Sequence, residues 1–400
     1  MYLFFSRALW ALSGLAVCAG TLQAQTLPTM RQAVEAAWVL SPPARALQNR
    51  QLELDARGRA ASSFISGQPS VSLARSSDRM NSNGGFREHE VEIAAPLWRS
   101  GVRAATAGQV EADRHNLERQ QLLARARLAG EVRELAAHAA IAQIELQLAV
   151  RRLAEAKLLT GDIERRVKAG DAARVDLLQS QSSAQLAAGV QTQATSALKR
   201  AQAQWLALTG LSEVSVLDET VGVAQDHPAV TAADAQLRAA QARLELTQKD
   251  RSDPMELSLG VIRERAALGS ASETRMQVAV RIPFGGDSRN APRVAAANAE
   301  VDIAQADALA AARTVQAERS AATSDLAAAR LAETLAAGRA RLSTEAQGLL
   351  ANAYRLGESD LPTRLRADNE RFDAELSHAR ARVETRRAIA KLNQAFGVQP

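Results

Sequence analysis

Two hydrophobic periods alternate along the chain, and each predicts a different kind of element. From about residue 28 to 65, Ala, Leu and Val recur at three- and four-residue steps, a pattern typical of a helix that Pro42-Pro43 interrupts. Between about 69 and 98 the period falls to two residues, on both sides of a polar loop that contains Gly84-Gly85. Period-two alternation around such a loop predicts a β-hairpin.

A very long helix is predicted after this hairpin. Residues 99 to 168 keep the helical period without a proline, and at about 1.5 Å per residue they would extend roughly 105 Å. Gly170 is expected to end the helix, and a return helix from 172 to 208 is expected to close at Gly210.

The same order of elements then recurs at an offset of 187 residues. Gly357 lies 187 residues after Gly170, and Pro283 lies 187 residues after Pro96. The pattern predicts a helix over 228–249, a hairpin over about 254–285, a long helix up to 356, and a last helix up to 396. We interpret the chain as an internal duplication, with the first repeat at 25–210, a linker at 211–226 and the second repeat at 227–400.

The predicted hairpins have the length and patterning of membrane strands. Each strand spans about eight to ten residues, which is enough for a tilted transmembrane β-strand. The side chains expected to face lipid are those of Val91, Ile93, Leu97, Val278, Val280 and Ile282. The polar side chains on the opposite face, which would line a barrel lumen or lie at its rim, are those of Glu90, Glu92 and Arg281.

Four strands per chain cannot form a membrane barrel alone. A sheet in lipid cannot leave its edges unpaired, and about eight strands is the practical minimum for closure. Closure therefore requires several chains, and the count alone leaves two, three or four copies open.

The composition favours long helices over globular domains. Apolar residues make up 46% of the chain but aromatic residues only 3%, so Ala, Leu and Val carry the apolar content. We therefore predict a mainly α fold with a small β part. Because Ala occurs on several helix faces, we favour helices with neighbours on both sides, as in a cylinder, over a soluble coiled coil of another kind.

The first residues indicate export. Arg7 precedes an apolar run that is too short to span a membrane, and Leu22-Gln23-Ala24 offers a cleavage site, so residues 1–24 are interpreted as a signal peptide. Cys18, the only cysteine, is either removed with this segment or lipidated as in a bacterial lipoprotein. The net charge of +5 comes from basic residues scattered among 44 acidic ones, which favours solvated helix surfaces over nucleic-acid binding.

The two turns and the strand exits carry a resemblance to a known family. The first turn, at 168–181, reads Lys-Ala-Gly-Asp-Ala-Ala-Arg-Val-Asp-Leu-Leu-Gln-Ser-Gln, and the second, at 354–365, reads Tyr-Arg-Leu-Gly-Glu-Ser-Asp-Leu-Pro-Thr-Arg-Leu. Together with Ala-Pro-Leu-Trp at 95–98 and the duplicated layout, these segments resemble the TolC-type outer-membrane efflux proteins over nearly the whole mature chain. The stretch Pro-Phe-Gly-Gly-Asp-Ser-Arg-Asn-Ala-Pro at 283–292 most resembles the branch that serves heavy-metal exporters.

This resemblance implies a long-helix α-barrel in the periplasm and a trimeric 12-stranded β-barrel in outer-membrane lipid. The implied partners are two further copies of the chain, a periplasmic adaptor (membrane fusion) protein and an inner-membrane pump of the resistance-nodulation-division type. The turns would be the periplasmic tips, where the adaptor docks. The residues assigned to them are Gly170, Asp171, Asp176, Leu177, Tyr354, Gly357, Glu358 and Asp360. The acidic members could equally cap the return helices.

The sequence departs from the family pattern in the second turn. Thr363 and Arg366 stand where some members carry aspartates that ring the pore entrance, and Pro362 lies in the first turn of the return helix, where proline is tolerated. An acidic constriction at the tip is therefore in question.

No enzymatic chemistry is expected. The five histidines are far apart in sequence, and no Ser/His/Asp arrangement or phosphate-binding loop stands out, so we predict neither catalysis, nor a metal site, nor a cofactor. The leading hypothesis is the passive outer-membrane channel of a tripartite efflux system for metal ions or small molecules. The alternatives are the channel of a type I protein secretion system and, disfavoured by two internal hairpins, a trimeric surface-anchored coiled coil.

Overall fold

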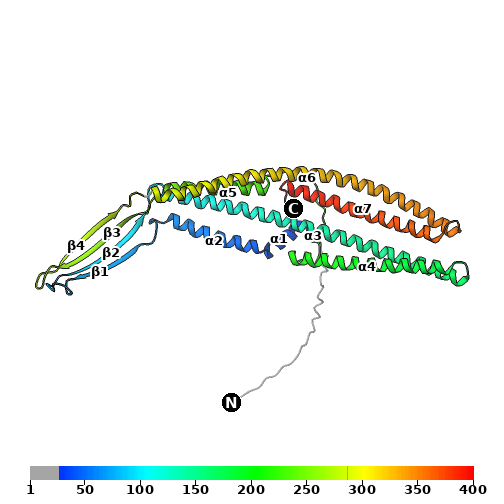
Figure 1. Ribbon diagram of the computed structural model, residues 1–400, viewed down its shortest axis with the longest axis horizontal. Helices are drawn as coiled ribbons and strands as arrows, with labels where there is room; N and C mark the ends of the chain where they lie inside the picture. Colours follow the sequence, from blue (N-terminus) through cyan, green and yellow to red (C-terminus); the bar gives the residue numbers. More distant parts are fainter. Residues whose placement is uncertain (1–26, 286) are drawn as a thin grey trace, which may run out of the picture.

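The computed structural model describes residues 27–285 and 287–400 and shows an elongated chain, with a sheet at one end and two helical turns at the other (Figure 1). The expected signal peptide and Cys18 lie outside the described residues. Within the described ranges, no helix combines the length and the hydropathy that crossing a membrane would require.

The first half of the chain contains two short and two long helices. α1 spans Met30–Leu40, α2 spans Pro42–Ser62, α3 spans Val102–Ala169 and α4 spans Arg174–Thr209. Ser41 is extended, and the prolines that follow occupy the first turn of α2, where their missing N–H groups cost nothing. The interruption predicted at Pro42-Pro43 is therefore the boundary between α1 and α2.

The second half is simpler. α5 spans Pro228–Lys249, α6 spans Asp287–Leu356 and α7 spans Leu361–Ala395. Asp360 caps α7 through a 3.0 Å hydrogen bond from the Thr363 N–H to its Oδ1, and Pro362 follows in the first turn. The predicted fold class, mainly α with a small β part, is confirmed.

The helices form a single layer in which α3 is the central member. α3 packs against α2 and α4 on one side and against α5 and α7 on the other, and α6 packs beyond α5 and α7 (Figure 1). α3 and α6 thus run the length of the layer, whereas the shorter helices follow one another end to end beside them. This layer holds the sheet and the turns at opposite ends of the molecule.

The sheet is antiparallel throughout, in the order β1-β2-β3-β4. Its strands are β1 (Ser70–Ser77), β2 (Arg87–Leu97), β3 (Met255–Arg265) and β4 (Glu273–Arg281). The pairing of β2 with β3 joins the two hairpins, which are far apart in sequence, into one surface. The hairpin ends also meet, because the Leu268 N–H donates to the Gly84 carbonyl at 2.9 Å.

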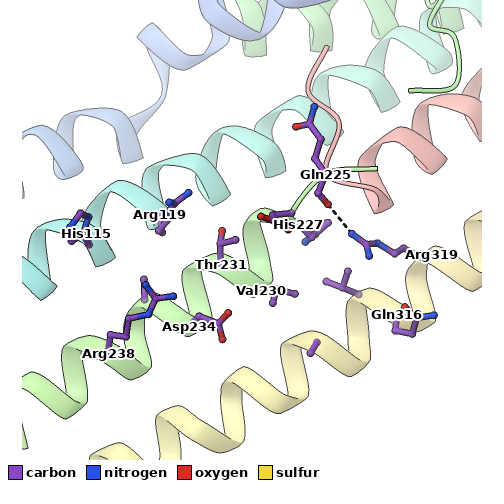
Figure 2. Close-up of a pocket in the computed structure, with 14 residues that line it drawn as sticks. His115, Arg119, Gln225, His227, Val230, Thr231, Asp234, Arg238, Gln316 and Arg319 are labelled. Carbon is purple, nitrogen blue, oxygen red and sulfur yellow. Dashed lines mark hydrogen bonds between the residues drawn. The ribbon is translucent and has the colours of Figure 1, made fainter. Parts of the chain in front are cut away.

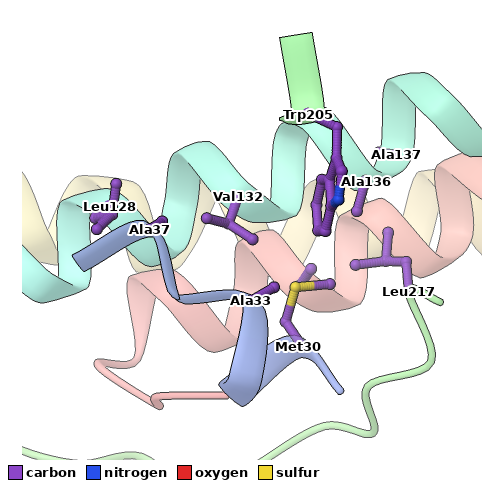
Figure 3. Packing of buried hydrophobic residues seen from close by; sticks show 10 residues of the cluster. Met30, Ala33, Ala37, Leu128, Val132, Ala136, Ala137, Trp205 and Leu217 are labelled. Carbon is purple, nitrogen blue, oxygen red and sulfur yellow. The ribbon is translucent and has the colours of Figure 1, made fainter. Parts of the chain in front are cut away.

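A compact apolar cluster fixes the middle of the layer (Figure 3). Trp205 of α4 is fully buried and belongs to the same cluster as Ala33 of α1 and Val132 of α3. Its indole N–H donates to the Glu213 carbonyl at 2.9 Å. Because Glu213 belongs to the irregular segment 211–227, this bond holds that segment against the helices. The core therefore lies at the equator of the molecule, midway between the sheet and the two turns.

A buried arginine joins the two halves next to this cluster. Arg133 of α3 is 3% exposed, and its Nε and Nη2 donate to the Glu219 carboxylate at 2.7 and 2.9 Å. The same guanidinium donates to Gln394 Oε1 at 2.6 Å and to the Val398 carbonyl at 3.2 Å. One side chain thus bonds the linker and the end of the second half to the first long helix.

Candidate channel surfaces

One face of the sheet is apolar across all four strands. Alternation along each strand sets the face of every side chain, and the ladder aligns Leu73, Val91, Val261 and Met276 in one row and Val71, Ile93, Leu259 and Val278 in the next. All eight side chains are exposed in the single chain. A contiguous apolar surface of this kind marks a contact with a partner or with lipid.

The sequence-predicted lipid-facing residues lie on or beside this face. Val91, Ile93, Leu97, Val278 and Val280 alternate onto it, and Ile282 follows the last residue of β4 with 62% of its surface exposed. Trp98, next to Leu97, donates its indole N–H to the Ser63 carbonyl at 2.9 Å. Their contact with lipid stays a prediction.

The opposite face is polar, and Glu90, Glu92 and Arg281 all belong to it. Glu92 accepts a 3.3 Å hydrogen bond from Ser72 across the ladder, and Arg281 lies 3.3 Å from the Glu256 carboxylate. Arg275 lies 3.0 Å from Glu264 on the same face. A sheet that is apolar on one side and charged on the other matches the wall of a water-filled barrel in lipid.

Neither edge of this sheet pairs with another strand among the residues that the structure describes. β1 and β4 are the outer strands, and every side chain of β1 is exposed. Because the four strands alternate in direction, β4 of one copy would run antiparallel to β1 of the next. The edges are thus compatible with a head-to-tail ring of identical chains. Such a ring would pair the edge strands, and a sheet in lipid requires this because its backbone groups find no water there.

The outer helices of the layer also present unpartnered apolar surface. On α6, Leu335, Leu342, Leu349 and Leu356 recur every seven residues and are 58 to 69% exposed. A stripe at this spacing is typical of a helix that packs along another helix. α4, at the opposite edge of the layer, exposes Leu186 and other apolar side chains in the same half of the molecule.

The two predicted turns have the same backbone conformation. Gly170 and Gly357 have φ of 86° and 79°, a left-handed conformation that glycine adopts without strain. The Asp171 N–H donates to the Arg166 carbonyl at 2.8 Å, and the Glu358 N–H donates to the Ala353 carbonyl at 2.9 Å. Each long helix therefore ends in a Schellman motif.

Most of the predicted tip residues form an exposed surface, but Tyr354 is buried. Gly170, Asp171, Gly357, Glu358 and Asp360 are exposed, and Asp176 and Leu177 are half-buried in the first turn of α4. Tyr354 is 7% exposed and packs with Ile163 of α3 and Leu361 of α7. The contact of these residues with an adaptor stays a prediction.

Tyr354 joins the two turns through charged neighbours as well. The guanidinium groups of Arg166 and Arg364 lie 5.4 and 5.5 Å from its ring centroid. Burial raises the pKa of the Tyr354 phenol, against the opposing effect of Arg166, so the ring stays neutral at ordinary pH. The position acts as a packing contact between the first and second helix pairs.

A series of ion pairs continues this contact along α3 and α7. Arg387 Nε lies 2.8 Å from Glu134, Arg380 Nε lies 2.9 Å from Glu145, and Arg371 pairs with Glu155. Most of these side chains are partly exposed, and such pairs contribute up to about 1 kcal/mol each. Their common effect is to fix the register of α7 on α3.

A polar cavity of about 660 Å³ lies between α3, α5 and α6 at the equator (Figure 2). His227 caps α5, its Nδ1 accepting from the Ala229 N–H at 3.2 Å, and burial lowers the pKa of this imidazole. Arg319 donates to the Gln225 carbonyl at 3.0 Å. Arginine and aspartate side chains are mixed along the cavity wall, so no one charge dominates it.

Comparison with known proteins identifies the architecture. No protein-family model matches the chain, and no curated protein matches it in sequence. Among solved structures, the outer membrane protein VceC from Vibrio cholerae superimposes with a TM-score of 0.75, at 15% identity, over 92% of this chain and 96% of that one. This chain has the fold of an outer-membrane channel.

Two further channels give the same result. The Campylobacter jejuni CmeC outer membrane channel has a TM-score of 0.72 at 13% identity, over 99% of this chain and 94% of that one. The open state of the Neisseria gonorrhoeae MtrE outer membrane channel has a TM-score of 0.71 at 15% identity, over 93% and 89%. The resemblance to TolC-type proteins is thus confirmed as a likeness of fold, and the heavy-metal branch stays a prediction.

The sequence reasoning missed two features of these surfaces. It assigned no role to the leucine stripe on α6, although the seven-residue spacing is visible in the sequence. It also did not follow the apolar face of the strands toward the loops, where Arg75 and further basic residues gather.

Proposed function

We propose that three copies of this chain form a channel in the outer membrane, with the sheets closing a 12-stranded barrel and the helices forming a tunnel in the periplasm. One observation carries the proposal: a sheet with an apolar face, a charged face and two free edges is joined to a helical layer with free edges of its own. A neighbouring copy would cover both kinds of edge at once.

The number of copies rests on the resemblance to TolC-type proteins. Four strands per chain allow several ring sizes, and a trimer is the size that this resemblance implies. The complementary directions of β1 and β4 allow cyclic closure by one repeated interface, whatever the number of copies.

We further propose that the channel is a passive conduit in a tripartite efflux system, and that it performs no catalysis. A periplasmic adaptor would dock at the exposed turns, and an inner-membrane pump of the resistance-nodulation-division type would supply the energy. The charged face of the sheet carries six glutamates and two arginines in each chain. An acidic lumen raises the local concentration of cations, which supports metal ions or cationic small molecules as cargo.

Purified protein in planar lipid bilayers tests this proposal. Native mass spectrometry should find three chains per particle, and the particles should give discrete conductance steps with a reversal potential that favours cations. Replacing Glu90 and Glu92 with glutamine should reduce that cation preference and leave the particle mass unchanged. A monomeric particle, or a trimer without conductance, would contradict the channel.

A further inference from the structure

The strand charges are separated between the two faces of the sheet. All six strand glutamates alternate onto the polar face, whereas five of the seven strand Arg and His side chains fall on the apolar face. The basic residues on the apolar face are Arg75, Arg87, His89, Arg263 and Arg265. No acidic residue in the described strands shares that face.

These five residues form a band at one end of the apolar surface. Arg75, His89 and Arg263 are direct partners across β1, β2 and β3, and Arg87 and Arg265 form the next row toward the loops. The row of Arg75 begins two residues beyond Leu73, Val91 and Val261, a step of roughly 7 Å. The basic band therefore borders the apolar surface directly.

Most of the band is available to a ligand. Arg75, Arg87, His89 and Arg263 are exposed, and none of their side chains forms a hydrogen bond or an ion pair with a described residue. Arg265 is half-buried and donates to the Gly85 carbonyl at 3.3 Å. By contrast, Arg275 and Arg281 on the polar face both lie beside glutamates.

We propose that this basic band binds the phosphate groups of lipid headgroups in the leaflet on the loop side of the sheet. The inference rests on the proposed function, because that function places the adjoining apolar face in lipid. A lipid is the occupant that fits both neighbours, since its acyl chains would cover Leu73 and Val261 while its phosphate would meet Arg75 and Arg263. Guanidinium groups bind phosphate through paired hydrogen bonds.

Lipid retention by the purified full-length oligomer tests the proposal. The detergent-solubilised protein is mixed with equal amounts of phosphatidylglycerol and phosphatidylcholine, and native mass spectrometry counts the lipids retained by each oligomer. The wild type should prefer phosphatidylglycerol. The variant Arg75→Gln/Arg263→Gln should reduce that preference by about fivefold for each arginine removed.

Two matched variants separate this site from general charge attraction. Arg275→Gln/Arg281→Gln removes the same charge from the polar face of the same sheet and should keep the preference. Arg75→Lys/Arg263→Lys keeps the charge and should retain most of the preference for phosphatidylglycerol. Increasing salt should weaken the preference of the wild type, a measurement that does not depend on any variant folding.

The outcomes distinguish the lipid site from the channel. Equal retention of both lipids by a conducting wild-type trimer would overturn the lipid site, leave the channel intact and assign the band to another occupant such as an acidic protein. Equal losses in the polar-face control would also overturn it. A wild-type chain that forms no membrane-inserted oligomer would overturn both proposals.

Discussion

At the scale of single residues, Arg133 joins the first long helix to the linker and to the end of the second half. Its guanidinium is almost fully buried and bonds Glu219, Gln394 and the Val398 carbonyl. Removing one partner of a buried ion pair leaves the other charge without compensation, which costs far more than the loss of an exposed pair.

Arg133→Ala should therefore lower the free energy of unfolding by about 3 to 5 kcal/mol. The control is Arg151→Ala, because the Arg151 side chain is 57% exposed in its pair with Glu375, and it should cost at most about 1 kcal/mol. Urea unfolding followed by circular dichroism measures both. Similar losses in the two variants would show that the equator does not depend on Arg133.

At the scale of elements, the two faces of β4 should differ in whether they tolerate a charged side chain. Val280 belongs to the apolar face and Ala279, its neighbour in sequence, to the polar face. If lipid covers the apolar face, an arginine there would lose solvation, whereas an arginine in the lumen would stay in water.

Val280→Arg should impair assembly in the outer membrane, with a cost of about 2 to 4 kcal/mol per chain if the position lies near the middle of the bilayer. Ala279→Arg introduces the same residue one position earlier and should assemble normally. Trimer yield in outer-membrane fractions measures both. Normal yield from Val280→Arg would place the apolar face outside the membrane.

The elements could be predicted from sequence where the signal was local. Period-two alternation placed Val91 and Glu92 on opposite faces, and Pro42-Pro43 and Gly170 marked where helices end. The burial of Tyr354 could not be predicted, because it depends on Ile163 from the other helix pair. The partners of Arg133 likewise come from distant positions, and no periodicity in the sequence encodes them.

At the scale of the whole molecule, the layer places both turns at the end opposite the sheet (Figure 1). Ala172 and Ser359 follow the two glycine turns at equivalent places, and both are partly exposed. If that end lies in the periplasm, these positions are available to a periplasmic partner and shielded from reagents outside the cell.

Cysteines introduced at Ala172 or Ser359 should cross-link to a periplasmic adaptor in intact cells, as mass spectrometry of the cross-linked product would show. A cysteine at Leu268, in the loop between β3 and β4, is the matched control and should react with an impermeant maleimide added from outside. Labelling of Ala172→Cys from outside instead would reverse the assigned orientation.

The bonds of Arg133 also set an order of events during folding. Its contacts with Gln394 and Val398 span 261 and 265 positions. Closing a loop of that length costs entropy that only the finished contact offsets, so such contacts form slowly and late. Each helix hairpin can form from its own residues alone, but the equator can close only when residues 394–398 are also in place. A folding intermediate that lacks these contacts would have formed helix hairpins that are not yet joined at the equator.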